Sequence, residues 1–510
     1  MRAKILTRAV LATVSAIPAA GALAQTPVFE PRPIAEHVYA GGWEHFVGGG
    51  VAAFDCNGDK LPELYAAGGT NPAQLFLNTS AGIGGALSYQ PMQAEALALT
   101  GVIGAYPLDI DGDGLLDLAI LRVGPDLLMQ GQGDCAFAPF ENLTLSETEA
   151  WTTAFSATWE AEQTLPTLAF GTYVDRADPD GPFEACDDTR LFRPQKDGYG
   201  AAEVLTPGYC ALSMLFSDWA RTGRADLRIS NDRHYYVRGG QEQLWAMEGT
   251  PRLYSEAEGW KPYSLWGMGI ASRDLNGDGW SDVYLTSMGD QKFQIRDSDA
   301  SGPVFEDVTY GFGTTAHRPF TGGDGRPSTG WHAAFGDANN DARDDIFVAK
   351  GNVEQMPDAA MKDPNNLLLQ DEDGQFSEAG ARAGVASLDR SRGAVFEDLN
   401  LDGFLDLAVV NRRAPMELYQ NAGGDGNWLL VDVQGAAPNT RAVGGFLELR
   451  SGTRMVTREI TVGGGHAGGS AVMHHFGLGT AETVEIRMLW PDGRVDEWQS
   501  VKVNQILTVK

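Results

Sequence analysis

An acidic nonapeptide recurs along the chain and constrains its fold more than any other feature. The second copy reads Asp109-Ile110-Asp111-Gly112-Asp113-Gly114-Leu115-Leu116-Asp117, and the clear copies begin at residues 55, 109, 274, 337 and 398. Each copy has oxygen-bearing side chains at relative positions 1, 3, 5 and 9. In chain order these are Asp55, Asn57, Asp59 and Glu63; Asp109, Asp111, Asp113 and Asp117; Asp274, Asn276, Asp278 and Asp282; Asp337, Asn339, Asp341 and Asp345; Asp398, Asn400, Asp402 and Asp406.

The spacing of these oxygens predicts binding of Ca²⁺. Alternate residues of an extended loop point the same way, so positions 1, 3 and 5 can converge on one hard cation. A carbonyl near position 7 and the acid at position 9 complete a loose cage of the kind that calcium accepts and magnesium does not. Gly114, Gly279 and Gly403 at position 6 let the backbone turn inward, whereas Lys60 and Ala342 at this position predict weaker sites.

Two other interpretations of the repeat are open. Asp, Asn and Gly also form polar hairpin turns that hold no metal. An EF-hand has its last ligand at position 12 and helices on both sides. Here the acid stands at position 9, and short apolar runs typical of buried strands follow it, as at residues 118–121 and 407–410. Five matching copies favour calcium over a simple turn.

Two weaker copies fill the gaps in the series. The copy at residue 158 keeps Glu160 and Glu162 but has Pro166 at position 9, and the next keeps only Asp218 and Asp226. Neither is expected to bind metal. The seven starts (55, 109, 158, 218, 274, 337, 398) give intervals of 54, 49, 60, 56, 63 and 61 residues by subtraction. Repeats of this length, each with several short strands, indicate radial blades. We predict an all-β protein with a seven-bladed β-propeller at residues 25–423.

The remaining residues, 424–510, are expected to form a small β-sandwich packed on the propeller. Apolar and polar residues alternate at 431–433, 446–450 and 484–488. Within this part Gly463, Gly465 and Gly468 match GxGxxG, which indicates dinucleotide binding only where a helix follows a strand. Residues 470–476 have the pattern of another strand, so nucleotide binding is not expected.

The first 24 residues have the pattern of a secretory signal peptide. Arg2, Lys4 and Arg8 precede an apolar stretch at residues 9–20, and small residues end at Ala24. The stretch is short for a membrane span, and no later stretch is long enough. We expect a secreted or periplasmic protein, cleaved near Ala24 and without a membrane span. A retained anchor is the alternative.

The four cysteines are expected to form two disulfides, because the count is even and export leads to an oxidising compartment. Proximity in the sequence suggests Cys186 with Cys210, which leaves Cys56 for Cys135; other pairings stay open. No CxxC is present, so zinc or a catalytic thiol is not expected.

The charge of the chain excludes one class of partner. Lys and Arg number 38 and Asp and Glu number 68, which gives −30, and loss of Arg2, Lys4 and Arg8 gives 35 − 68 = −33. Nucleic acid is a poor partner for that field.

The motifs also carry a family resemblance. The acidic loops with their flanking strands resemble the FG-GAP, or VCBS, repeats of integrin-α-type propellers. Residues 427–510 resemble the ASPIC/UnbV domain of the cartilage acidic protein family. The matching stretches there are residues 428–431, 442–445, 461–466, 475–479 and 490–494. The resemblance implies a secreted calcium-binding protein with a role in adhesion or extracellular interaction. It supplies no catalytic residues.

An extracytoplasmic enzyme, such as a carbohydrate-active lyase or hydrolase, is the alternative function. The chain contains no GxSxG, no HExxH and no phosphate loop. Polar and aromatic runs between repeats are the candidates for a site, namely residues 43–45, 231–236, 315–319 and 331–332. Asp232, Arg233 and His234 are the first choice for chemistry. A deep pocket that joined His234, His317 and His332 to acids would favour an enzyme, and a flat face would oppose one.

The function that we expect is that of an interaction module, monomeric or weakly oligomeric, which recognises an extracellular protein or glycan. Rigid scaffolds with exposed loops favour recognition. No sequence motif identifies which protein or glycan it recognises.

Overall fold

The computed structural model describes residues 25–143, 145, 149–160, 163–196, 198–232, 240–315 and 326–510. Over these ranges the protein is almost entirely β. The described helices are α1 (Gly380–Ala383) and two 3₁₀ turns, η1 (Trp43–His45) and η2 (Glu256–Glu258). None of them is long and apolar enough to cross a bilayer. The predicted signal peptide, residues 1–24, lies outside the described residues, so its cleavage stays a prediction.

Residues 29–421 form a series of antiparallel sheets, each a meander of four strands from that region. In chain order these sheets are β2 (Val51–Phe54), β3 (Glu63–Ala66), β4 (Gln74–Asn78), β5 (Tyr89–Met92); β6 (Val102–Leu108), β7 (Asp117–Arg122), β8 (Leu127–Gly131), β9 (Phe137–Pro139); β10 (Thr152–Thr158), β11 (Thr167–Thr172), β12 (Thr189–Phe192), β15 (Glu203–Leu205); β16 (Ala211–Ser217), β17 (Asp226–Asn231), β18 (Gln243–Ala246), β19 (Arg252–Leu253); β20 (Gly267–Arg273), β21 (Asp282–Ser287), β22 (Lys292–Arg296), β23 (Phe305–Asp307); β24 (Gly330–Gly336), β25 (Asp345–Lys350), β26 (Asn366–Gln370), β27 (Phe376–Glu378); and β28 (Arg390–Glu397), β29 (Asp406–Arg412), β30 (Glu417–Asn421), β1 (Phe29–Arg32). A hairpin of β13 (Pro194–Gln195) and β14 (Gly198–Tyr199) stands apart.

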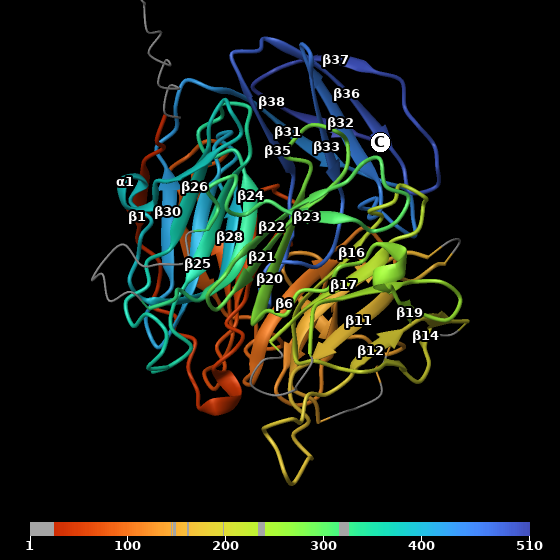
Figure 1. Cartoon of the computed structure of the whole chain (residues 1–510). Helices are drawn as coiled ribbons and strands as arrows, with labels where there is room; N and C mark the ends of the chain where they lie inside the picture. Colours follow the sequence, from red (N-terminus) through yellow and green to blue (C-terminus); the bar gives the residue numbers. More distant parts are fainter. Residues whose placement is uncertain are drawn as a thin grey trace, which may run out of the picture.

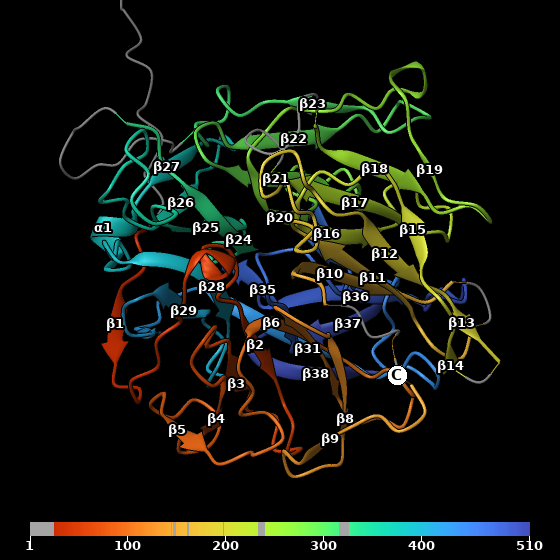
Figure 2. The ribbon, with the colours of Figure 1, turned by 90° about the horizontal axis from the view of Figure 1, so that it is seen from below.

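The first strands of these sheets lie around the middle of the molecule (Figure 2). They contact one another in chain order, from β2 to β6, β10, β16, β20, β24 and β28, and β28 in turn contacts β2. The last sheet takes its outer strand from the other end of this region, since β1 pairs antiparallel with β30.

The sheets bury their faces against one another. One core cluster joins Phe54 of β2, Ile120 of β7 and Leu418 of β30, which belong to three different sheets. Small residues let the first strands approach closely: a side chain on Gly393 would meet the backbone of Gly50 at 2.6 Å. The glycine-rich runs before the acidic loops therefore have a packing role at the centre.

The C-terminal residues form two further sheets over one core, at one end of the first strands (Figure 1). The first sheet contains β31 (Asn427–Val433), β35 (His474–Gly479) and β38 (Gln505–Val509). The second contains β32 (Phe446–Ser451), β33 (Arg454–Glu459), β36 (Thr483–Leu489) and β37 (Gln499–Lys502). Leu429, Phe476 and Ile486 lie in their shared core.

One strand of the expected C-terminal domain lies elsewhere. The pattern at residues 470–476 predicted a single strand, but β34 (Ser470–Ala471) pairs parallel with β2, and β35 starts only at His474. The reason is that residues 470–471 extend the β2 sheet by hydrogen bonding at its edge.

Both predicted disulfides are present. Cys56 is bonded to Cys135, and Cys186 to Cys210. The first joins the β2 sheet to the β6 sheet, and it encloses 79 residues against 24 for the second.

Candidate metal loops and domain interface

Each clear acidic loop joins the first strand of a sheet to the second. Position 9 is the first residue of the second strand in all five loops, at Glu63, Asp117, Asp282, Asp345 and Asp406. The nonapeptide thus occupies one structural position in five sheets.

The acid at position 1 organises the turn. In the second loop Asp109 accepts hydrogen bonds from the N–H groups of Gly112 and Gly114, both at 2.9 Å. The acids that begin the other four loops likewise accept at least two backbone N–H groups from within the loop. The carboxylate is therefore held in place by its own loop.

The acid at position 9 is buried and tied to two segments. Asp117 accepts from the N–H of Ile110, at position 2, at 2.7 Å and from the N–H of Gly131 in β8 at 2.8 Å. The aspartates at position 9 of the last three loops repeat both bonds. The loop is thereby fixed to the third strand of its sheet.

Left-handed backbone recurs at position 6. The glycines there have φ near +90°, and Lys60 and Ala342 adopt the same conformation, with φ of 76° and 73°. The turn therefore survives without glycine, at an energetic cost that a side chain incurs in this region.

The donor set suits a hard cation. In the second loop, oxygens of Asp109, Asp111 and Asp117 all lie within 4.8 Å of one another; among the described residues no other loop brings three acids so close. Burial raises the pKa of Asp117 to about 8, and the neighbouring acids add to the shift. Burial likewise raises the pKa of Asp282 to about 8. Buried carboxylates that repel one another favour a cation between them, so these residues fit calcium.

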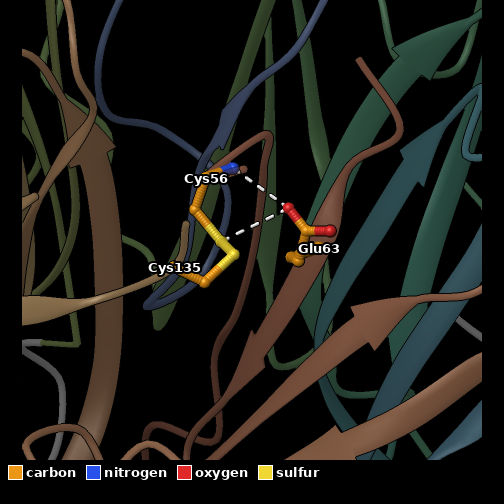
Figure 3. Close-up of side chains that lie close together, drawn as sticks. All are labelled: Cys56, Glu63 and Cys135. Carbon is orange, nitrogen blue, oxygen red and sulfur yellow. Dashed lines mark hydrogen bonds between the residues drawn. A yellow bond between two sulfur atoms is a disulfide. The ribbon is translucent and has the colours of Figure 1, made fainter. Parts of the chain in front are cut away.

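The first loop differs because its acid at position 9 lies beside a disulfide (Figure 3). The N–H of Cys56 donates to Oε2 of Glu63 at 3.0 Å, and Cys56 Sγ lies 3.3 Å from the same oxygen. Burial raises the pKa of Glu63 to about 7. The disulfide to Cys135 anchors this loop to the neighbouring sheet.

In the two weaker copies, arginine side chains form ion pairs with the acids. Arg193 pairs with Glu160 at 3.0 Å, and Arg224 pairs with Asp226 at 3.1 Å. Glu162 lies outside the described residues. Guanidinium groups at these acids agree with the expectation that these two copies bind no metal, which stays a prediction.

The C-terminal domain contacts the acidic loops directly. Four loops provide hydrogen bonds: Thr440 Oγ1 donates to Asp109, the Thr457 N–H to Asp274 at 3.3 Å, the Gly479 N–H to the Asn340 carbonyl at 2.9 Å, and His475 Nε2 to the Gly403 carbonyl at 2.9 Å. In the first loop Leu61 packs with Leu430 in an apolar cluster. The predicted ligand loops are therefore also the docking surface for this domain.

Residues 462–470, here called the finger, leave the C-terminal domain and lie among the first strands. The N–H groups of Gly464 and Gly465 donate to the carbonyls of Met214 and Ile270, both at 2.7 Å. The Gly469 N–H donates to Ala105 at 3.3 Å. The finger thus bonds to strands β16, β20 and β6, from three different sheets.

His466 is the centre of the finger. Its Nε2 accepts from the Gly48 N–H at 3.1 Å, its Nδ1 donates to the Met268 carbonyl at 3.0 Å, and its own N–H donates to Nδ1 of His332 at 3.0 Å. Its ring lies 4.9 Å from that of Trp331. Burial lowers the pKa of His466 to about 3 and that of His332 to about 4, so both rings are neutral.

The glycines of the GxGxxG match serve this close approach. Gly463 and Gly465 have φ of 134° and 58°, and a side chain on Gly468 would overlap the backbone of Val51. The strand β34 follows them instead of a helix. Two features of the sequence are consistent with this close approach: the many glycines at residues 463–469, and the glycines in the first strands that contact the finger. Neither feature shows that these two parts of the chain pack against each other.

The structure describes two of the residues that were candidates for chemistry, Asp232 and His332. Asp232 follows β17 and is buried, and the Tyr173 hydroxyl donates to its Oδ2 at 2.6 Å. Arg233, His234 and His317 lie outside the described residues. His332 accepts a hydrogen bond from the finger.

Two family models match parts of the chain. One, described as FG-GAP-like repeat, matches residues 55–120, and the other, described as ASPIC and UnbV, matches residues 435–510. The resemblance inferred from the sequence motifs is confirmed.

Among curated proteins the chain is similar to cartilage acidic protein 1. It is 27% identical to the Homo sapiens protein over 241 residues, which are 45% of this chain and 33% of that one. The Mus musculus protein gives 27% over 241 residues, 45% of this chain and 34% of that one. The match spans about a third of the length of these relatives.

Solved structures give weaker likenesses. BBS1N in complex with ARL6DN has a TM-score of 0.43 at 10% identity, covering 78% of this chain and 98% of that one. An Agrocybe aegerita lectin that recognises non-reducing terminal N-acetylglucosamine has a TM-score of 0.38 at 16% identity, covering 71% and 88%.

Proposed function

We propose that the chain is an extracellular calcium-binding interaction module built on a seven-bladed β-propeller. The observation that carries the proposal is the recurrence of one acidic loop at the same place in five sheets, beneath a second domain that contacts all five. A seven-bladed ring is supported by the contacts between first strands, which run from β2 round to β28 and back to β2.

Calcium has a structural role in this proposal. Within each loop the oxygens at positions 1, 3, 5 and 9 would hold the ion, which would neutralise carboxylates that now face one another. Asp109 and Asp274 also accept hydrogen bonds from Thr440 and Thr457 of the C-terminal domain. Metal in the loops would therefore stabilise the domain interface as well as the blades.

The proposed location is outside the cytoplasm. Two disulfides are typical of oxidising compartments, and the similarity to cartilage acidic protein 1 agrees with an extracellular setting. In this proposal residues 1–24 are removed on export, and the mature protein recognises a protein or glycan as a monomer.

Metal content together with thermal unfolding tests the calcium claim. The mature protein, purified in calcium and desalted, is expected to contain about five Ca²⁺ by mass spectrometry and to melt at a lower temperature in chelator. A ligand at about one hundred times its dissociation constant adds about 2.7 kcal/mol per site. Absence of bound metal, with melting unchanged by chelator or added calcium, would refute the proposal.

A loop variant assigns the metal to its ligands. Asp278→Ala changes an exposed ligand at position 5, and Asp282→Asn keeps the shape of the buried one; each is expected to lose one Ca²⁺ per molecule. Asp290→Ala and Asp299→Ala are matched controls, because these acids are exposed and lie in other turns of the same sheet. Unchanged stoichiometry in the loop variants would contradict the assignment.

A further inference from the structure

A cavity of about 370 Å³ lies at the end of the first strands that is remote from the C-terminal domain. Its lining includes Met268 and Trp331, near the starts of β20 and β24, whereas the acidic loops follow the ends of the first strands. In Figure 1 the C-terminal strands are at the top and the red η1 turn, which contributes Trp43 to the lining, is at the bottom. The volume is typical of small-molecule pockets.

The finger forms the base of this region. His466 packs against the Trp331 ring and donates to the Met268 carbonyl, and both of those residues line the cavity. The finger therefore packs directly behind two residues of the cavity wall.

The walls are aromatic and come from distant parts of the chain. The rings belong to Trp43, Phe46, Trp151, Tyr173, Phe183 and Trp331. Trp43 is 39% exposed and Phe183 is 67% exposed. Large aromatic side chains with this much exposed surface beside an apolar cavity indicate a binding site.

The rings are held in position before any ligand arrives. The centroids of Trp43 and Trp151 are 4.8 Å apart, as are those of Trp151 and Tyr173, and both pairs meet edge to face. The Trp331 Nε1 donates to the Gly351 carbonyl at 2.7 Å. A pre-organised pocket loses little conformational entropy on binding.

The carboxylates of the lining are already engaged. Glu354 pairs with Arg412 at 2.8 Å, with Arg390 at 3.3 Å and with Arg413. Asp232 accepts from Tyr173. A sugar needs many hydrogen bonds and would leave hydroxyls unpaired here. Two acids, with no basic side chain among the described lining residues, disfavour an anion.

We propose that this cavity binds an uncharged, apolar small molecule that carries one or two rings. Rings of the ligand would stack on or meet the edges of the wall rings, and methionines at the base would adapt to its shape. The cavity is separate from the acidic loops, so this proposal does not depend on whether those loops bind calcium.

Fluorescence titration of the full mature protein, in saturating calcium, tests the proposal. The probe is N-phenyl-1-naphthylamine, which is uncharged and emits strongly in an apolar site. We expect saturable binding that Trp43→Ala and Phe183→Ala each weaken about tenfold, as loss of one wall ring implies. Val353→Phe, which fills the cavity, should abolish binding. Tyr310→Ala is the matched control, because this ring is 69% exposed and lies outside the cavity.

Competition identifies the ligand class. 2-Phenylethanol is expected to displace the probe, and N-acetylglucosamine is not. Displacement by the sugar at equal concentration, or stronger displacement by 2-phenylethylamine than by the alcohol, would overturn the assignment to an uncharged apolar ligand. Absence of saturable binding, or equal binding by all variants whose thermal midpoints match the wild type, would overturn the site itself.

Discussion

Adding one methyl group to Gly50 or to Gly104 should displace Ala467 and His466 of the finger. A side chain on Gly50 or on Gly104 would overlap the carbonyl of Ala467. Both glycines have ordinary backbone angles, so alanine brings no backbone strain of its own. The overlap is with backbone, which cannot rotate away, and Ala467 is fully buried. The finger must move, and His466 then loses its partners.

The size of the effect follows from those partners. Displacement of His466 breaks its bonds to Gly48, Met268 and His332. At about 1 kcal/mol each they contribute about 3 kcal/mol. Replacement of glycine by alanine restores about 0.4–1 kcal/mol through the unfolded chain. The net loss is about 2–3 kcal/mol. With an unfolding entropy of roughly 1 kcal/mol/K for a chain of 510 residues, the melting temperature should fall by about 2–3 °C.

The double variant provides the sharper assay. Because both methyl groups displace the same carbonyl, Gly50→Ala combined with Gly104→Ala should cost about as much as either alone. Calorimetry measures the midpoints, and limited proteolysis within residues 462–470 reports exposure of the finger. Gly249→Ala is the control, since nothing lies within 4 Å of a side chain there. Additive losses, or a finger that stays protected in both single variants, would refute this reasoning.

Two further predictions concern stability. Burial lowers the pKa of His332 to about 4 and that of His466 to about 3, against 6.5 in the unfolded chain. Above pH 6.5 both rings are neutral in both states, so the free energy of unfolding is at its full value. It falls as the pH drops towards 4, because the unfolded chain then binds protons that the folded protein does not. Each should cost about 2 kcal/mol at pH 5, and urea midpoints at pH 7.5 and 5 should differ less in His332→Asn than in the wild type; an equal difference would contradict this. Replacing Cys56 and Cys135 by serine opens a 79-residue loop and should cost about 4 kcal/mol by urea unfolding, more than removal of the shorter disulfide. The reverse order would contradict the loop-length argument.

The repeat made much of this fold predictable. Position 9 of each nonapeptide begins a strand, because the acid must accept backbone N–H groups from both its own loop and the next strand, as Asp117 does from Ile110 and Gly131. Such contacts are local, and local spacing encodes them. Proximity in the sequence also suggested the pair Cys186–Cys210, which left Cys56 for Cys135. The calcium ligands themselves stay a prediction, since occupancy depends on the ion.

The rest could not be predicted because its contacts are distant in sequence. Gly50 and Gly104 must lack side chains because the carbonyl of Ala467 packs against them. Ala467 lies more than 360 residues later in the sequence, so no local sequence pattern predicts this contact. The aromatic cavity likewise assembles Trp43, Tyr173 and Trp331 from three segments that look unrelated in the sequence. Three of the polar and aromatic runs, residues 43–45, 231–236 and 331–332, contribute Trp43, Asp232 and Trp331 to the lining of this cavity.

The pairing of β1 with β30 determines when the protein can finish folding. The last sheet needs residues 29–32 and 417–421 together, so its outer edge stays open until nearly the whole chain has left the ribosome. The finger arrives later still, from residues 462–470. Until then the chain has an exposed strand edge and an unfilled centre, both of which invite aggregation. Its assembly is thus completed by its C-terminal residues, and a chain truncated after β30 would close its last sheet without ever receiving the finger.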